Sequence, residues 1–419
     1  MEYFAVTGGR PLEGSAVIHG AKNSALPILA ATLLARGESV IHNCPDLADV
    51  TAALDILTCL GCWVRREGDA VLVDTSCAGG HRVPHSLMGR MRASVLFLGA
   101  LLAREGQAEA GWPGGCSLGA RPIDLHLSAF RALGAQVQDS HETIFCRGRT
   151  LQGTRLTLPI PSVGATENAM LAACGAEGVT ILQNPAREPE IADLQGFLQA
   201  MGADVEGAGT ERIIIRGGRP LRPAVYRVMA DRIVTATYLC SVASAGGRGE
   251  FTGTDGSHLL PVLDALTAAG CTIRREPDRV TIRRDSPLGG VSITTGPYPG
   301  FPTDAQPLLA AALAGGVGES TITETIFDRR FRYLQGLEAM GASIRLEGNT
   351  ARITGRPLRG GQTHAADLRG GAALVIAALG AEGESRITGL SHIDRGYQGL
   401  EDTLQKLGAS IRRTKDKGT

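Results

Sequence analysis

The sequence has no excess of charge of either sign. Lys plus Arg and Asp plus Glu both number 42 in the 419 residues, and no basic run stands out. Nucleic acids and anionic membranes attract basic surfaces or tails, so this balance argues against either as a partner. A small anionic substrate remains compatible with it, because a neutral chain can still gather its cations in one place.

Long hydrophobic runs and a leader are also missing. The first residues, MEYFAVTGGRPLEG, contain neither the basic start nor the apolar stretch of a signal peptide. The longest apolar helical stretches, such as residues 25–35, fall well short of the roughly 20 residues that a membrane span needs. We therefore expect a cytoplasmic protein with no membrane partner.

Cysteine occurs without a structural pattern. The nine cysteines are an odd number with no disulfide framework, which indicates reduced thiols. Cys59 and Cys62 form one CxxC, but no second Cys or His pair follows at ligand spacing, so packing around a turn is favoured over zinc or redox chemistry. Signatures for ATP, nicotinamide, zinc-protease and serine-hydrolase chemistry are missing as well. We predict no metal and no cofactor.

Glycine is abundant, with 56 residues, and some of its positions mark an internal repeat. Segments such as FRALGAQVQD and LEAMGASIRL, each a helix that turns at a glycine into a strand, recur at intervals of 73, 68, 68, 71 and 67 residues. Such even spacing is very improbable by chance. Glycine suits the turn because the residue after a helix often takes a positive φ. The six glycines are Gly61, Gly134, Gly202, Gly270, Gly341 and Gly408.

The repeated unit predicts the fold class. It reads as strand, apolar helix, strand, amphipathic helix and strand pair. Helices that are apolar nearly all round, such as 25–35 and 305–314, belong in a core. The strands alternate apolar and polar residues, as half-exposed sheets do. We predict an α/β protein with helices inside and sheets outside, whose six units form two groups of three with a ligand cleft between them.

Two turns in the first half carry residues suited to an anion. Lys22 stands at the start of an apolar helix, where its charge and free amides could hold an anion together; the alternative is an N-cap at Asn23 or Ser24 with a surface lysine. Cys116 is flanked by glycines and followed five residues later by Arg121, a setting that exposes a thiol and lowers its pKa.

The second half holds further charged turns. Asp304 directly precedes an apolar helix, and its pattern fits an N-cap and a functional carboxylate equally well. Arginines and aspartates then recur at equivalent turns of the repeated units. An isolated surface salt bridge is worth little, so we interpret the recurrence as convergence on an anion. These turns contain Asp328, Arg329, Arg330, Asp367, Arg369, Asp394 and Arg395.

These residues resemble the UDP-N-acetylglucosamine 1-carboxyvinyltransferase family of enolpyruvyl transferases. The resemblance runs from end to end, through GAKNSALPILAATLLA, PGGCSLGARPIDLHL, PSVGATENAML, FPTDAQ, ETIFDRRF, DLRGGAAL and HIDRGY in family order. PGGCSLGARPIDLH separates that family from the related shikimate-pathway transferases. The resemblance implies an inside-out α/β barrel with one three-repeat domain at 22–228 and another formed by 1–21 and 229–419.

The resemblance also implies a reaction. In it, the 3′-hydroxyl of UDP-N-acetylglucosamine takes the enolpyruvyl group of phosphoenolpyruvate, which opens peptidoglycan precursor synthesis. It assigns Lys22, Arg121 and Arg395 to phosphoenolpyruvate. Cys116 matches the acid at C3, which also forms an adduct with phosphoenolpyruvate and is alkylated by fosfomycin, and Asp304 matches the general base.

Further site residues follow from the same motifs. Arg330, Asp367 and Arg369 match additional active-site charges. One departure concerns Ile160, where the family commonly has a lysine, which puts nucleotide affinity in question. The residues matched to the nucleotide sugar are Asn23, Arg92, Arg121, Pro122, Ile123, Asp124, Leu125, Ser162, Val163, Gly164 and Ile326.

Two alternatives remain at this point. A shikimate 3-phosphate enolpyruvyl transferase would leave the PGGC loop without a use. A non-catalytic paralogue that only binds a nucleotide sugar is disfavoured by the presence of Lys22, Cys116, Asp304 and Arg395. The sequence does not indicate an oligomeric state.

Overall fold

The structure is a computed structural model that describes residues 2–114, 122–140 and 142–415. Cys116 and Arg121, both expected in the site, lie outside the described residues. The described chain forms two compact units. The first unit contains residues 20–114 and 122–229, and the second contains residues 2–19 and 230–415. None of the described helices combines the length and apolarity that crossing a membrane would take.

The first unit has three four-stranded sheets among its described residues, ordered β14-β3-β5-β4, β6-β7-β9-β8 and β10-β11-β13-β12. Its helices are α1 (Lys22–Ala31), η1 (Thr32–Leu34), α2 (Ala48–Cys59), α3 (His85–Met88), η2 (Arg92–Val95), α4 (Leu96–Glu105), α5 (Asp124–Ala132), α6 (Val163–Cys174) and α7 (Pro189–Ala200). Its strands are β3 (Glu38–His42), β4 (Trp63–Glu67), β5 (Ala70–Asp74), β6 (Arg82–Val83), β7 (Gln107–Gly111), β8 (Gln136–Asp139), β9 (Thr143–Arg147), β10 (Arg155–Thr157), β11 (Val179–Gln183), β12 (Asp204–Glu206), β13 (Arg212–Arg216) and β14 (Val225–Arg227).

The second unit repeats this plan, with the sheets β2-β15-β17-β16, β18-β19-β21-β20 and β22-β23-β1-β24. Its helices are α8 (Arg232–Ala245), η3 (Gly256–Leu259), α9 (Leu260–Ala268), α10 (Gln306–Ala314), η4 (Arg330–Tyr333), α11 (Leu334–Ala339), α12 (Leu368–Gly380), α13 (Leu390–Ile393) and α14 (Leu400–Lys406). Its strands are β1 (Glu2–Thr7), β2 (Leu12–Val17), β15 (Gly247–Thr252), β16 (Thr272–Glu276), β17 (Arg279–Arg284), β18 (Ser292–Thr294), β19 (Glu319–Thr323), β20 (Ser343–Glu347), β21 (Thr350–Thr354), β22 (Gln362–His364), β23 (Glu384–Thr388) and β24 (Ser410–Lys415).

The apolar helices form the core of each unit, as the sequence predicted. In the second unit α8, α10 and α12 pack against one another, and every residue of α10 is buried. In the first unit α4 packs against α1 and α6. The sheets cover these helices, and a strand such as β13 alternates buried Ile213 and Ile215 with more exposed neighbours. Burial of apolar side chains on one sheet face and all around the central helices drives this arrangement.

The six turn glycines have the conformation that their spacing predicted. Their φ angles lie between +89° and +105°, a region that disfavours side chains bearing a Cβ. Each lies in the turn between a helix and the strand that follows it. Cys174 and Cys240, which lie in the apolar helices α6 and α8, are buried. Of the CxxC pair, Cys59 is exposed and Cys62 is buried, and burial raises the pKa of Cys62 to about 11.

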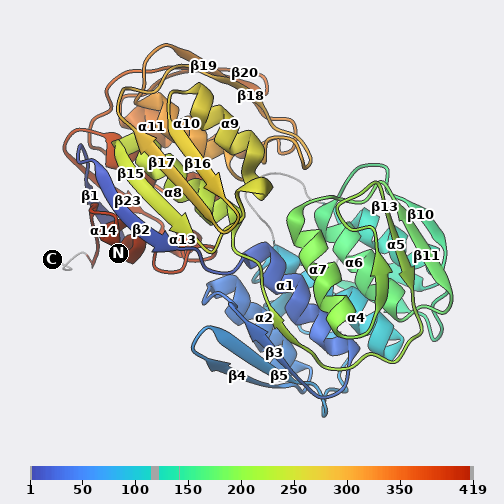
Figure 1. Ribbon diagram of the computed structural model, residues 1–419. Coiled ribbons are helices and arrows are strands. Elements are labelled where there is room, and N and C mark those ends of the chain that lie inside the picture. The colour runs from blue at the N-terminus through green and yellow to red at the C-terminus, as the bar shows by residue number, and fades with distance from the viewer. Residues whose placement is uncertain (1, 115–121, 141, 416–419) are drawn as a thin grey trace. The chain divides into compact units, whose positions relative to one another are not determined.

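The strand pairing shows one feature that the repeat pattern did not predict. Strand β2 directly precedes α1 in sequence, yet it pairs in parallel with β15 of the second unit (Figure 1). The equivalent position beside β3 is taken by β14, which comes some 190 residues later. The N-terminal strand β1 completes the sheet of the last repeat, between β23 and β24. The N-terminal strand β1 and the C-terminal strand β24 therefore pair within one sheet of the second unit.

Candidate active site

Asp304 is the centre of a charged cluster in the second unit. Helix α10 has Ala305 as its N-cap and no side-chain cap, so the N-cap interpretation of Asp304 is wrong. The carboxylate instead forms a salt bridge with Nη2 of Arg330, and its Oδ2 lies 3.4 Å from Nε of Arg369. The two arginine side chains are only 2% exposed, whereas that of Asp304 is 30% exposed. Two buried cations thus fix a carboxylate that solvent or a ligand can reach.

Arg369 has hydrogen-bonding capacity that the described protein does not use. Its Nη1 and Nη2 are buried and have no hydrogen-bond partner among the described residues. Burial acts to lower the pKa of Arg369, but Tyr397, Asp304 and Asp231 outweigh it, and the pKa is raised above its ordinary value. A buried, charged guanidinium with unused donors costs free energy unless a partner arrives. Such donors are suited to an anionic or oxygen-rich ligand.

The first turn of α12 holds Arg369 in place. Asp367 is the N-cap of this helix, and its Oδ1 accepts a hydrogen bond from the Gly370 amide at 2.9 Å. The guanidinium carbon of Arg369 lies 5.3 Å from the centre of the Tyr397 ring, a cation–π distance. The hydroxyl of Tyr397 is 2.8 Å from that of Thr237. Asp367 therefore acts here through the helix terminus and not as a direct partner of Asp304.

Arg330 holds the turn that carries Asp304. Its Nε donates to the carbonyl oxygen of Thr303 at 3.0 Å, beside its salt bridge to Asp304. Its guanidinium carbon also lies 5.6 Å from the ring centre of Phe327. One side chain thus bonds to both the backbone and the carboxylate of the same turn, which restricts the rotation of Asp304.

Glu324, which the sequence analysis missed, organises the loop next to this turn. Its Oε1 accepts hydrogen bonds from the amides of Ile326 and Phe327, and its Oε2 accepts one from the Thr303 hydroxyl at 2.9 Å. Glu324 is 4% exposed, and Ile326 on the same loop is 37% exposed. A sequence signal did exist, since Glu324 follows a strand at a position where four of the other five repeats have Asn or Gly.

Lys22 begins α1 in the first unit. The N-cap of α1 is Ala21, without a side-chain cap, so the alternative of an N-cap at Asn23 or Ser24 is wrong. Nζ of Lys22 lies 3.4 Å from Oδ2 of Asp49, and both side chains are largely buried. The hydroxyl of Ser24 donates to Asp193 on α7, which anchors the first turn of the helix.

Arg92 and the described segment that begins at Pro122 also meet in the first unit. Nη2 of Arg92 donates to the carbonyl oxygen of Pro122 at 3.1 Å. Ile123 is buried and is the N-cap residue of α5, with Asp124 in its first turn. Leu125 packs against the core of the unit. The structure therefore brings Arg92 next to Pro122, another of the residues matched to the nucleotide sugar.

The segment around Ser162 lies beside the same helix. The hydroxyl of Ser162 accepts a hydrogen bond from the Ala165 amide at 3.4 Å and caps α6, whose first residue is Val163. A Cβ added to Gly164 would lie 3.0 Å from Cε1 of His126 on α5, so a larger residue there would crowd the ring. The segments 122–125 and 162–164, both matched to the nucleotide sugar, are thus neighbours. Ile160, where a lysine was expected, is 61% exposed.

Arg395 is the remaining described cation that was expected to bind phosphoenolpyruvate. Arg395 is half-buried in the turn between α13 and α14, next to Asp394, whose carboxylate bonds to Arg413 at 2.6 and 3.0 Å. In the parts of the chain that the structure describes, no group of three His, Cys, Asp or Glu side chains is arranged to hold a metal ion.

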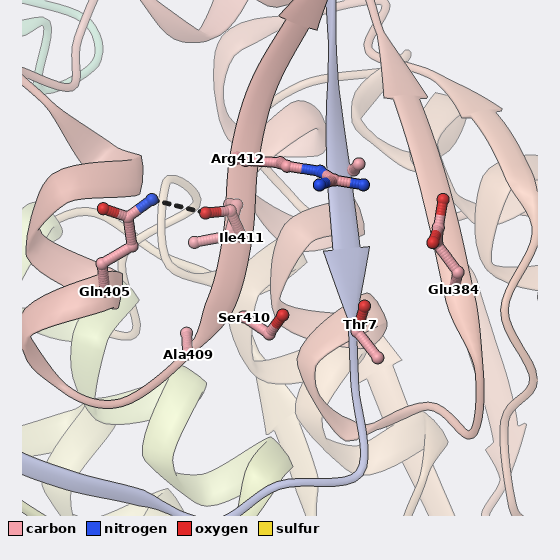
Figure 2. Close-up of a pocket in the computed structure, with 8 residues that line it drawn as sticks. Thr7, Glu384, Gln405, Ala409, Ser410, Ile411 and Arg412 are labelled. Carbon is pink, nitrogen blue, oxygen red and sulfur yellow. Dashed lines mark hydrogen bonds between the residues drawn. The ribbon is translucent and has the colours of Figure 1, made fainter.

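A cavity of about 370 Å³ lies at the sheet β22-β23-β1-β24. Figure 2 shows Thr7, Glu384 and Arg412 on its strands, and Gln405 of α14 donating to the carbonyl oxygen of Ile411 at 2.6 Å. None of the residues expected for substrate binding or catalysis lines this cavity. We therefore do not assign it to the site.

Comparisons with known proteins bear on the family and the fold of this chain. Residues 6–404 match the model of the family described as EPSP synthase (3-phosphoshikimate 1-carboxyvinyltransferase). A protein of Caldanaerobacter subterraneus subsp. tengcongensis named UDP-N-acetylglucosamine 1-carboxyvinyltransferase 2 is 47% identical over 417 residues, which cover 99% of this chain and 100% of that protein.

Solved structures show the same architecture. The enolpyruvyl transferase NikO from Streptomyces tendae matches with a TM-score of 0.88 at 27% identity, over 99% of both chains. An EPSP synthase from Acinetobacter baumannii matches with a TM-score of 0.78 at 20% identity, over 99% of this chain and 100% of that one. The latter identity is so low that the match bears on the fold alone. The predicted inside-out α/β architecture is confirmed.

Proposed function

We propose that this chain transfers the enolpyruvyl group of phosphoenolpyruvate to the 3′-hydroxyl of UDP-N-acetylglucosamine. The chain belongs to the EPSP synthase (3-phosphoshikimate 1-carboxyvinyltransferase) family. Inorganic phosphate is the second product. The reaction supplies peptidoglycan precursor synthesis and takes place in the cytoplasm. The acceptor is chosen over shikimate 3-phosphate because a relative named for UDP-N-acetylglucosamine is 47% identical over 99% of this chain.

The observation that carries the proposal is the cluster of Asp304, Arg330 and Arg369. A reaction that adds a hydroxyl to phosphoenolpyruvate needs a carboxylate to take the proton and cations to hold anionic groups. Asp304 is a carboxylate that two buried arginines fix in place, and Arg369 keeps two buried donors without a partner among the described residues.

The chemistry uses the remaining residues in separate roles. Asp304 accepts the proton of the 3′-hydroxyl as its oxygen bonds to C2 of phosphoenolpyruvate, while Cys116 delivers a proton to C3. The tetrahedral intermediate then loses phosphate as C3 gives up a proton, which restores the double bond. Lys22, Arg121 and Arg395 bind phosphoenolpyruvate. Acid–base assistance of this kind is worth about 10²–10⁴ in rate, and alignment of two substrates about 7–11 kcal/mol.

The nucleotide sugar is recognised mainly by the first unit. Asn23 and Arg92 serve the sugar and the phosphates. The uridine is served by Ser162, Val163, Gly164 and Ile326. The neighbourhood of Gly164 and His126, and the bond from Arg92 to Pro122, support this assignment because they gather the matched segments within one unit.

The proposal is tested by measuring phosphate release from phosphoenolpyruvate with each acceptor separately. We expect release with UDP-N-acetylglucosamine, none with shikimate 3-phosphate, and inhibition by fosfomycin. Release with shikimate 3-phosphate alone would overturn the choice of acceptor. Binding of the nucleotide sugar without any turnover would favour the non-catalytic alternative.

A further inference from the structure

Glu324 is a buried carboxylate held by several donors. Besides the amides of Ile326 at 2.8 Å and Phe327 at 3.2 Å, its Oε1 accepts from the Thr295 hydroxyl at 3.0 Å. Its Oε2 accepts from the Thr303 hydroxyl at 2.9 Å. No salt bridge to Glu324 is found among the described residues. Four hydrogen bonds therefore compensate the cost of burying this side chain.

These bonds tie together two loops that are distant in sequence. Thr295 and Thr303 bracket the loop that leads from β18 to α10, and Ile326 and Phe327 belong to the loop after β19. The second loop is also bonded to the first by its own backbone, since the Thr325 amide donates to the Thr295 hydroxyl at 2.8 Å. Glu324 lies at the junction, so its carboxylate sets how the loops approach each other.

The internal repeat shows that this use of Glu324 is not part of the common fold. The corresponding residues directly after the second strand of each unit are Asn43, Trp112, Asn184, Gly253, Glu324 and Gly389. Four of them, the asparagines and glycines, have positive φ and simply turn the chain. The two exceptions are Trp112, which precedes the segment containing Cys116, and Glu324, which precedes the segment containing Ile326. The common fold does not need a carboxylate at this position, because the other five repeats turn without one.

We propose that Glu324 is a positioning residue for the transfer reaction, an inference that rests on the proposed function. It acts through Thr303 on the adjacent Asp304, and through the Ile326 amide on the loop that faces the nucleotide sugar. It therefore couples the base that activates the hydroxyl to the loop that binds the molecule carrying that hydroxyl. Phosphoenolpyruvate, bound by Lys22, Arg121 and Arg395, does not depend on it.

The experiment measures kcat and both KM values by phosphate release for the full-length chain and its Glu324 variants. For Glu324→Ala we expect the KM for UDP-N-acetylglucosamine to rise and kcat to fall, each ~10-fold or more, because displacement of catalytic groups by about 1 Å can cost on the order of 10²-fold. The KM for phosphoenolpyruvate should change less than about twofold. Glu324→Gln should restore most of the loss, because its amide oxygen still accepts from the loop amides and its nitrogen can donate to Thr303.

Ser320→Ala is the matched control. Ser320 is 3% exposed on the same strand, and its hydroxyl accepts a hydrogen bond from the Val291 amide at 3.2 Å, at the end of the strand remote from Asp304. It should lower the melting temperature without changing either KM. If Glu324→Ala does not fold, Thr303→Val tests the proposal in its place, because it removes only the hydrogen bond to Oε2 of Glu324. This variant should lower kcat by a larger factor than it raises the KM for UDP-N-acetylglucosamine.

The outcomes separate this inference from the proposed function. If the wild-type chain releases no phosphate with either acceptor, the proposed function has failed. If the wild type is active and Glu324→Ala, or Thr303→Val in its place, changes only the melting temperature as Ser320→Ala does, the positioning role is overturned. An equal rise of both KM values would overturn it too, since that result indicates general loosening of the unit.

Discussion

Nε of Arg369 lies 3.4 Å from Oδ2 of Asp304, while the two terminal nitrogens of the same guanidinium are buried without a partner in the described chain. Arg369 thus holds the carboxylate through Nε, while the described protein leaves the donors of its terminal nitrogens unused. The planar guanidinium makes this possible, because its donors are held in a rigid fork.

Arg369→Lys should therefore be far from conservative. An ammonium keeps the charge but cannot bond to Asp304 and present two further donors, nor stack in the same way on Tyr397, 5.3 Å away. We expect kcat/KM for phosphate release to fall on the order of 10²-fold, the scale of losing one fixed donor at a reacting centre. Arg352→Lys, at a salt bridge with Glu319 on an exposed sheet face, is the control and should leave the rate unchanged. Similar rates for both variants would show that the fork of Arg369 is not used.

Cys116 should be the thiol that fosfomycin modifies. The thiolate is the reactive form, and burial raises the pKa of Cys44 and Cys271 to about 11 and of Cys146 and Cys174 to about 12, so these remain thiols near neutral pH. Mass spectrometry of the treated protein should show one adduct, on the peptide that contains Cys116. Modification of Cys59 or Cys77, which are exposed, in preference to Cys116 would contradict the assignment.

Cys116→Ser tests the acid role directly. A hydroxyl is a much poorer proton donor than a thiol, so most phosphate release should be lost. Binding of UDP-N-acetylglucosamine, followed by calorimetry, should persist because the nucleotide sugar is assigned to other residues. Full activity of this variant would remove Cys116 from the mechanism.

The sequence predicted the repeated part of the fold because its signals are local. A glycine with positive φ at the end of a helix is specified by the few residues around it, and Gly134 and Gly341 show this at φ of +91° and +90°. The pairing of β2 with β15, and of β14 with β3, could not be predicted in the same way. Both strands look alike in sequence, and pairing with β15 or β3 is decided by contacts across some 200 residues.

The site was predictable in its residue types and not in its contacts. Asp304 fits an N-cap by pattern, and only the folded chain shows that Arg330, 26 residues away, and Arg369, 65 residues away, hold it. Glu324 escaped notice because a glutamate after a strand carries no motif on its own. It stands out only by comparison with the other five units, because four of them have Asn or Gly at the equivalent turn.

Glu167 should make stability depend on pH. It is buried on α6, and burial, followed by the nearby Glu190 and Glu188, raises its pKa well above 4.5. In the unfolded chain the group ionises near 4.5, so above that pH the folded state binds more protons than the unfolded state. Stability then falls as pH rises, by up to about 1.4 kcal/mol per pH unit, until the folded-state pKa is passed.

Glu167→Gln removes this proton linkage. The variant should gain stability relative to the wild type as the pH is raised from about 5 to 8, which melting temperatures across that range would show. Glu177→Gln, at an exposed position just after the same helix, is the control. Its melting temperature should change with pH in parallel with that of the wild type. A constant difference between Glu167→Gln and the wild type at all pH values would contradict the linkage.

The turn glycines should be needed for their backbone angle and not for lack of space. Gly202 has φ of +94°, and a Cβ built there meets no atom within 4 Å. Gly202→Ala should therefore cost about 1–2 kcal/mol, the penalty of a left-handed conformation for an L residue. Gly79 in the same unit is equally open but does not have a positive φ, so Gly79→Ala should be neutral or stabilise by up to about 1 kcal/mol through the unfolded state. Urea midpoints of the two variants measure the difference, and equal midpoints would mean that the repeated glycines are kept for a reason other than the helix-to-strand turn.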